Sequence, residues 1–222
     1  MQRLWVVVVP VKRLEVAKSR LNLHLGTVRR DLALAMVLDT VTVAAACRGV
    51  RVVVVTDDEV VSDAARAAHV QVVADEPGAG INAALVHGAR AAGALDGAGV
   101  AALSGDLPSL RSAELSLALA RASCHPRSFV ADATGAGTTM YAATSRRLFE
   151  PRFGADSAAA HALAATALDT DGLDGLRRDV DTLEDLRAAV ELGLRPRTAH
   201  VVTSQVVALL GAGDLPAIRP AS

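Results

Sequence analysis

The chain has 222 residues, of which 51% are hydrophobic and only 2% are aromatic, so valine, leucine and alanine must fill its core. This length favours a single domain, and the formal net charge of −1 argues against nucleic-acid binding as the main function. Cys47 and Cys124 stand far apart without a CxxC pair, which predicts reduced thiols of a cytoplasmic protein rather than a disulfide scaffold or zinc site. The apolar run at residues 4–11 is too short to span a bilayer, and no signal-peptide pattern precedes it.

Strand and helix patterns alternate along the chain. Runs rich in β-branched residues predict buried strands at Trp5–Pro10, Arg51–Thr56 and Val70–Ala74, and the short apolar run Val100–Ser104 reads as a fourth strand. Apolar periodicity predicts helices at Arg30–Cys47, Glu59–Ala68, Asn82 to about Ala94, Glu114–Ser123, Ser157–Thr166 and Leu183–Leu192. This alternation predicts a three-layer α/β fold with a mainly parallel sheet covered by helices on both faces.

Three segments depart from the regular alternation. Arg127–Ala131 and Thr138–Ala143 read as strands around a glycine loop, which predicts a mixed sheet there. Residues 168–178 read as a loop with room for a short strand. Residues 199–222 have no clear period and are expected to form a loosely ordered C-terminal extension, outside a domain at 1–198.

A short basic loop follows the first strand, which ends at Pro10. Lys12, Lys18, Ser19 and Arg20 crowd into it, at the carboxyl end of a strand where open α/β sheets bind ligands. Several cations beside free backbone N–H groups suit a polyphosphate. On charge alone, a solvated basic loop is the more common explanation.

Acidic residues follow two later elements. Asp106 comes directly after a buried strand and could hold Mg²⁺, although an aspartate there is equally typical of a helix cap. Asp179 and Asp181 lie two apart, on one side of an extended segment, and could face one metal site. We expect Asp179 to face the site, with Asp181 or Thr182 capping the following helix.

Weaker signals come from the glycine-containing turns. Gly80 and Asn82 open a helix and could approach a flat ring and read a base edge, although a turn with a cap explains them equally well. Gly154 and Ser157 could bind a carboxylate or phosphate, but in isolation a serine cap is the more common reading. His161, one turn after Ser157, is expected to be a surface histidine. The chain has no acidic-partnered GxGxxG, nucleophile elbow, metal-binding His pair or Walker loop, which argues against nicotinamide, hydrolase and P-loop chemistry.

Taken together, these motifs resemble the 2-phospho-L-lactate or phosphoenolpyruvate guanylyltransferases, the CofC/FbiD family. The matching stretches occur in family order: Pro10 to Leu21, Gly80-Ile81-Asn82, Asp106-Leu107-Pro108, Gly137-Thr138-Thr139, Phe153 to His161 and Asp179 to Leu186. Ile81 stands where leucine is expected, and the segment beyond Thr198 has no counterpart.

The resemblance implies a GT-A-like, Rossmann-like nucleotidyltransferase that acts in coenzyme F-420 biosynthesis. GTP would transfer GMP to a phosphorylated three-carbon acid, phosphoenolpyruvate or 2-phospho-L-lactate, with release of pyrophosphate; the chain's composition favours phosphoenolpyruvate. A downstream F-420 transferase is a conceivable partner, and neither nucleic acid nor membrane is expected as one.

The resemblance also implies roles for individual residues. Lys12, Lys18, Arg20 and Asp106 would be catalytic, and Asp106, Asp179 and Asp181 would hold Mg²⁺. The phospho-acid would lie near Thr139, Gly154 and Ser157. The nucleotide would contact Pro10, Lys12, Lys18, Ser19, Arg20, Gly80, Asn82 and Ser104.

Two alternatives stay open at this point. One is another GT-A-like nucleotidyltransferase with a different acceptor; such enzymes commonly carry a Leu-Ala-Ala-Gly-type loop where this chain has Val-Pro-Val-Lys. The other is a catalytically silent nucleotide-binding domain, which would tolerate substitution of Asp106 and Asp179.

Overall fold

The computed structural model describes residues 3–15, 17–18, 21, 25–76, 78–93, 97–210 and 215–216. The described strands form one seven-stranded sheet in the order β3-β2-β1-β4-β6-β5-β7. Their bounds are β1 Trp5–Pro10, β2 Val50–Val55, β3 Gln71–Val73, β4 Gly99–Leu103, β5 Arg127–Ala131, β6 Thr138–Ala143 and β7 Thr166–Ala167. The first four strands are mutually parallel, whereas β6 is antiparallel to both β4 and β5. The expected mixed, mainly parallel sheet is therefore confirmed.

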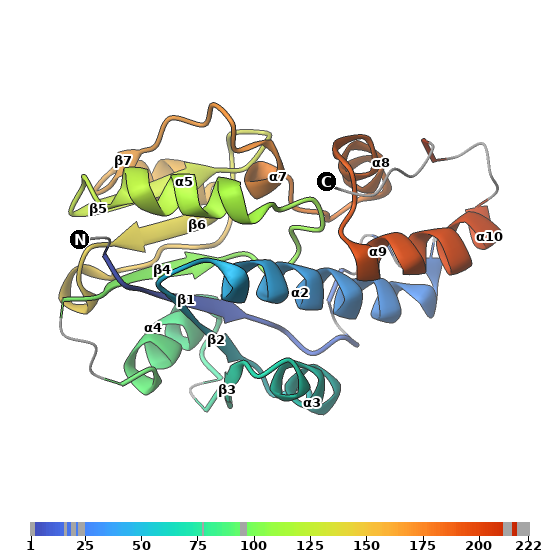
Figure 1. Ribbon diagram of the computed structural model, residues 1–222, viewed down its shortest axis with the longest axis horizontal. Coiled ribbons are helices and arrows are strands. Elements are labelled where there is room, and N and C mark those ends of the chain that lie inside the picture. The colour runs from blue at the N-terminus through green and yellow to red at the C-terminus, as the bar shows by residue number, and fades with distance from the viewer. Residues whose placement is uncertain are drawn as a thin grey trace.

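Helices cover both faces of this sheet (Figure 1). The longer ones are α2 Val28–Ala46, α3 Glu59–Ala67, α4 Ile81–Ala91, α5 Ser112–Ala122 and α8 Leu183–Leu192. The shorter ones are η2 Arg146–Leu148, α6 Ser157–Ala162, α7 Asp174–Arg177, α9 Pro196–Val201, η3 Val202–Val206 and α10 Val207–Leu210. Among the described residues, no helix is both long and apolar enough to cross a membrane.

Alternation along β1 sorts its side chains between two apolar clusters. Val7 and Val9 pack with α2, α3 and α5, whereas Val6 and Val8 pack with α4 and α6 on the other face. A strand buried on both faces must be apolar at every position, which explains the uninterrupted valine run. Gly88 allows α4 to approach closely, because a Cβ there would lie 2.5 Å from Val55 and 2.7 Å from Val8.

One helix is shorter than its sequence pattern predicts. The expected helix at Ser157–Thr166 ends at Ala162, and Thr166–Ala167 instead form β7, paired in parallel with β5. Alanine favours helix, but this preference is weak, and pairing with the sheet edge overrides it. The expected loop at 168–178 contains the short helix α7.

The C-terminal segment also differs from the expectation of loose order. Described residues 199–210 form an almost continuous helical run of α9, η3 and α10 beside α2 (Figure 1). Val201, Val202 and Val206 are buried there against Leu32 and Met36 of α2, in a third apolar cluster that α8 also joins. Because α9 crosses residue 198, that position is not a structural boundary, although the proposed limit of the nucleotidyltransferase domain stays a prediction.

Asp39 fastens this run to α2. Its side chain is buried and accepts hydrogen bonds from the backbone N–H of Thr198 at 2.8 Å and of Arg197 at 3.3 Å. The Thr198 hydroxyl donates to the same carboxylate at 2.8 Å. A buried carboxylate on the first turn of α9 satisfies N–H groups that the helix itself leaves unpaired.

Candidate active site

The candidate site lies between β1 and β4 at their carboxyl ends. These two strands are adjacent and parallel, yet the chain leaves β1 toward β2 on one side, whereas β6 lies on the other side of β4. Such a reversal of strand order opens a crevice above the sheet, where ligands of α/β proteins bind. The basic loop after β1 and the loop carrying Asp106 both end there.

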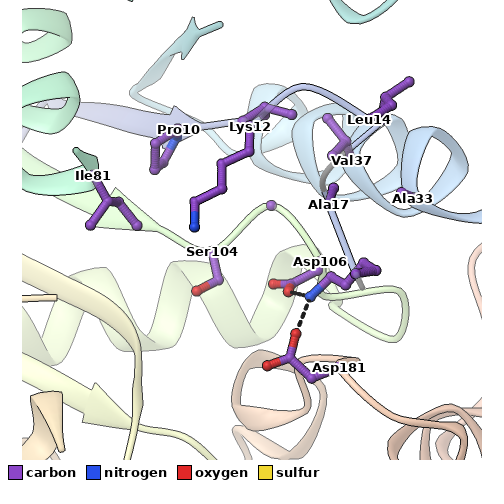
Figure 2. Close-up of a pocket in the computed structure, with 13 residues that line it drawn as sticks. Pro10, Lys12, Leu14, Ala17, Ala33, Val37, Ile81, Ser104, Asp106 and Asp181 are labelled. Atoms are coloured by element: carbon purple, nitrogen blue, oxygen red, sulfur yellow. Dashed lines mark hydrogen bonds and ion pairs between the residues drawn. The ribbon is translucent and has the colours of Figure 1, made fainter. Parts of the chain in front are cut away.

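A cavity of about 370 Å³ occupies this crevice (Figure 2). It is lined by Pro10, Val11, Lys12, Leu14, Ala17, Lys18, Ala33, Val37, Ile81, Ser104, Gly105, Asp106 and Asp181. Figure 2 shows the Lys12 side chain reaching toward Ser104, with the Asp106 and Asp181 carboxylates on the same side of the cavity. The exposed Lys12 makes no hydrogen bond or ion pair with the described part of the chain. It is therefore available to a bound anion.

Lys18 joins the two acidic segments. Its Nζ donates to Oδ2 of Asp106 and, at 2.6 Å, to Oδ1 of Asp181. Burial alone would lower the pKa of Lys18, but attraction to Asp106 and then Asp181 outweighs it and the pKa is raised. The ammonium therefore stays charged at neutral pH. The backbone of Lys18 has a left-handed φ of 55°, which few non-glycine residues adopt.

Asp179 is electrostatically part of the same site. Burial raises its pKa to about 7, and the negative charges of Asp106 and Asp181 add to this effect, partly offset by Lys18. The backbone beside it is tied to the β4 loop, because the N–H of Val180 donates to the carbonyl of Asp106 at 3.2 Å. Thr182, rather than Asp181, caps α8, in a reciprocal capping box with Asp185. Asp181 is thus left facing Lys18.

The carboxylates of Asp106 and Asp181 suit a hard cation such as Mg²⁺, but they do not form a complete set of protein ligands for it. Among the described residues, no group of three or more His, Cys, Asp or Glu side chains stands in metal-binding geometry. Mg²⁺, however, is usually held by one or two carboxylates together with substrate phosphates. Asp106 and Asp181 converge on one positive charge already, so this donor set fits Mg²⁺ bound together with a nucleotide.

Two residues that our sequence analysis did not single out shape the basic loop. The buried guanidinium of Arg29 donates to the carbonyls of Leu14 at 3.0 Å and Glu15 at 2.8 Å, and also to that of Ala17. Asp58, the N-cap of α3, accepts the N–H of Leu14 at 2.8 Å. The sequence does not indicate that Arg29 and Asp58 hold the basic loop, because their partners are backbone atoms, which any sequence provides.

Ser19 and Arg20 lie outside the described residues. Of the other expected nucleotide contacts, Pro10, Lys12, Lys18 and Ser104 line the cavity with Asp106 and Asp181. Gly80 and Asn82 do not line it, although Ile81 between them does.

The three expected acid-binding residues stand beside the cavity rather than in its lining. Thr139 on β6 accepts the backbone N–H of Ser104 at 2.9 Å through its carbonyl, which places it next to the Asp106 loop. Its hydroxyl is buried and has no hydrogen-bond partner in the described structure, so it is free for a ligand. Gly154 is exposed with a φ of 147°, whereas Ser157 is buried as the first residue of α6, whose N-cap is Asp156.

One sequence-based expectation about this region is wrong. His161 is not at the surface, because its ring is buried and stacks on Tyr141 with centroids 4.6 Å apart. The Asn82 amide, for which we expected a base contact, bonds the backbone of Phe153 through both its oxygen and its nitrogen, at 2.8 and 2.9 Å. Neither contact has a sequence signature, since the partners come from distant segments.

Comparison with known proteins agrees with this geometry. The family model for guanylyl transferases of the CofC-like type matches residues 5–192. The chain belongs to this family. It is 52% identical over 198 residues to the phosphoenolpyruvate guanylyltransferase of Thermomonospora curvata, covering 88% of this chain and 87% of the relative. It is 49% identical over 208 residues to the protein of the same name from Streptomyces coelicolor, covering 92% and 98%.

The fold of this CofC-like chain also occurs among solved structures. A nucleotidyl transferase from Methanothermobacter thermautotroptrophicus superposes with a TM-score of 0.61 at 20% identity, covering 86% of this chain and 98% of that one. CMP:2-keto-3-deoxy-manno-octonic acid synthetase superposes with a TM-score of 0.54 at 16% identity, covering 83% and 97%. The expected nucleotidyltransferase fold and family are thereby confirmed.

Proposed function

We propose that this protein transfers GMP from GTP to phosphoenolpyruvate and releases pyrophosphate, as a step of coenzyme F-420 biosynthesis. The observation that carries the proposal is the cavity at the β1–β4 switch point, which Lys12, Lys18, Asp106 and Asp181 line together. The names of relatives about half identical to this chain support the reaction and the acceptor.

The chain's own residues supply binding, orientation and charge rather than covalent chemistry. The attacking group is the phosphate of the acid, already an anion, so no strong general base is required. The barrier is charge crowding at the α-phosphate of GTP, which preorganised cations lower. Lys12, exposed and unpaired in the described structure, would hold the β- and γ-phosphates and the departing pyrophosphate. Arg20 would supply a forked contact to the same groups.

We propose Mg²⁺ as the cofactor, held by Asp106 and Asp181 with Asp179 beside them. When bound, it would neutralise phosphate charge and favour in-line geometry. The Lys18 ammonium now occupies the space between Asp106 and Asp181. With Mg²⁺ held by these carboxylates, Lys18 would be able to contact a phosphate instead.

The acid would lie against Thr139, Gly154 and Ser157. The free buried hydroxyl of Thr139 supports this placement. The pocket must discriminate phosphoenolpyruvate from 2-phospho-L-lactate, and such small shape differences contribute only about 1–3 kcal/mol.

The deciding experiment measures pyrophosphate release with GTP, Mg²⁺ and, separately, phosphoenolpyruvate, 2-phospho-L-lactate and 3-phosphoglycerate, with mass analysis of the product. Release that depends on phosphoenolpyruvate, with a guanosine diphospho-acid of the matching mass, is the expected result. The downstream transferase is added in parallel reactions, because the product could be labile or inhibitory. GTP binding without turnover on any acid would instead favour the silent nucleotide-binding domain.

A further inference from the structure

The segment Arg152–Asp156, which leads to the expected acid site, is held by side chains from two helices. The backbone N–H of Arg152 donates to Nε2 of His161 in α6 at 2.9 Å. The next N–H, that of Phe153, donates to Oδ1 of Asn82 in α4 at 2.8 Å. Nδ2 of Asn82 donates back to the carbonyl of Phe153 at 2.9 Å. Three consecutive peptide groups, from Pro151–Arg152 to Phe153–Gly154, are therefore held by side chains outside the segment.

The Asn82 contact spans 71 residues of sequence and uses both functions of the amide. An asparagine side chain that gives its donor and its acceptor to one backbone residue closes a ring, and this fixes orientation as well as distance. The same ring fixes the direction of the amide, which keeps only its second N–H and its second lone pair for any further partner.

Both ring nitrogens of His161 also have hydrogen-bond partners in the protein. Because Nε2 accepts a backbone N–H, we assign the ring proton to Nδ1, which then donates to the hydroxyl of Thr138 at 2.9 Å. The ring packs on Tyr141 and meets the ring of Phe153 edge-on, with centroids 5.1 Å apart. His161 therefore ties the segment to β6, the strand that also carries Thr139.

The residues that follow these two anchors have unusual backbone conformations. Gly154 has a φ of 147° and Asp156 a φ of 52°, and residues other than glycine rarely adopt such positive φ values. Such conformations persist only where surrounding contacts determine them, and they cluster where a protein shapes itself around a ligand. The fixed peptides at 152 and 153 provide that determination here.

We propose that Asn82 and His161 are positioning residues that preshape the Gly154 segment for the phospho-acid, and that Asn82 does not recognise the guanine base. This inference rests on the proposed function, since it concerns the site of the acceptor acid. It places Asn82, at the start of α4, in support of the binding site for the phospho-acid rather than the binding site for GTP.

The kinetic test uses Asn82→Ala in the full chain, with KM measured separately for phosphoenolpyruvate and GTP. Loss of a preshaped segment should raise the KM for the acid by about tenfold or more. The KM for GTP and the preference for GTP over ATP should stay at wild-type values. A raised KM for GTP, or relaxed base preference with an unchanged KM for the acid, would overturn the inference and make Asn82 a base-reading residue. Partial misfolding would lower kcat through the active fraction but leave both KM values unchanged, and that pattern would also overturn it.

Two further variants sharpen the comparison. His161→Phe keeps an aromatic ring against Tyr141 but removes the acceptor for Arg152, and it should raise the KM for the acid in the same direction. Gln71→Ala is the matched control, since Gln71 also donates its amide to a backbone carbonyl, that of Ala91, but at the opposite end of α4. Its KM values should equal those of the wild type.

Hydrogen exchange tests the positioning without any turnover. The amides of Arg152 and Phe153 should exchange at least about tenfold faster in Asn82→Ala and His161→Phe than in the wild type or in Gln71→Ala. Unchanged exchange in both variants would overturn the inference, even if the enzyme is active. Conversely, a wild-type protein inactive with every acid would refute the proposed function, and the exchange result would still decide whether Asn82 and His161 hold the segment.

Discussion

Lys18 is the cation that pairs with two carboxylates of the candidate site. It pairs with Asp106 and Asp181, whose side chains are 20% and 48% exposed, while its own side chain is 12% exposed. Removing one partner of such a group leaves a partly buried charge without compensation, which costs more than the pair itself contributes. Asp106 is the more buried of the two carboxylates, so its loss should be the more damaging.

Asp106→Asn should therefore lower kcat by at least about 10²-fold with saturating Mg²⁺, by analogy with the loss of one preorganised electrostatic group. Steady-state pyrophosphate release checks this. Asp63→Asn is the control, because Asp63 is 83% exposed and, among the described residues, forms an ion pair only with Arg66 of the same helix. Turnover by Asp106→Asn close to that of Asp63→Asn would remove Asp106 from the mechanism.

Asp179 predicts a pH-dependent stability of the metal-free protein. Its pKa is raised from its ordinary value of 3.8 to about 7 in the folded state, mainly by burial and then by Asp106 and Asp181. The folded state therefore binds the proton more tightly than the unfolded chain, and stability falls as pH rises through this window. Asp179→Asn has no such ionisation, so its advantage in Tm over the wild type should grow between about pH 4 and pH 7 and stay constant above.

Thermal unfolding in a chelator across this pH range measures that difference, at about 2–4 °C for each kcal/mol in a protein of this size. The same variant should bind Mg²⁺–GTP more weakly than the wild type. A Tm difference independent of pH would show that Asp179 does not titrate in this window.

At the scale of elements, the helical run after residue 196 is part of the core. Val202 is fully buried in the cluster that α2, α8 and the run share. Val202→Ala removes two methyl-sized groups and should cost about 2 kcal/mol in the free energy of unfolding, including the cavity left behind. The corresponding fall in Tm is about 4–8 °C.

Denaturant and thermal unfolding check this value. Ser204→Ala is the matched control in the same run, because the Ser204 side chain is exposed and, among the described residues, its hydroxyl bonds only the carbonyl of His200. This substitution should change the free energy of unfolding by no more than about 0.5 kcal/mol. Equal stability of the two variants would mean that the run adds nothing to the core and behaves as the loose extension expected from its sequence.

At the scale of the whole molecule, ligand binding and folding are linked. The site joins loops after β1 and β4 to the segment before α8, so a ligand that bridges them should stabilise the native state as a unit. Mg²⁺ and GTP at about 100 times the Kd should add about 2.7 kcal/mol, which corresponds to roughly 5–10 °C in Tm. Addition of a chelator should remove most of this shift, whereas a nucleotide shift that survives the chelator would contradict metal-assisted binding.

Local patterns determined the strands β1 to β6 and the longer helices, but not β7, α7 or the helical run that begins at Pro196. The valine runs at β1 and β2 can be buried on both faces only inside a sheet, and Pro10 terminates the first run for lack of a donor. Because ligand sites in such folds lie at the carboxyl ends of strands, the sequence alone indicates Lys12, Lys18 and Asp106 as site residues. The family followed from motifs in those same loops.

Tertiary structure alone decided how side chains from distant segments are used. Asn82 looks like a helix-start residue free for a ligand, but Phe153, 71 residues away, takes both ends of its amide. Asp39 fastens a terminal helix, and Arg29 holds the basic loop, each through backbone atoms that any sequence provides. Periodicity records which face of an element is buried, whereas hydrogen bonds to backbone atoms depend on where two elements meet in space.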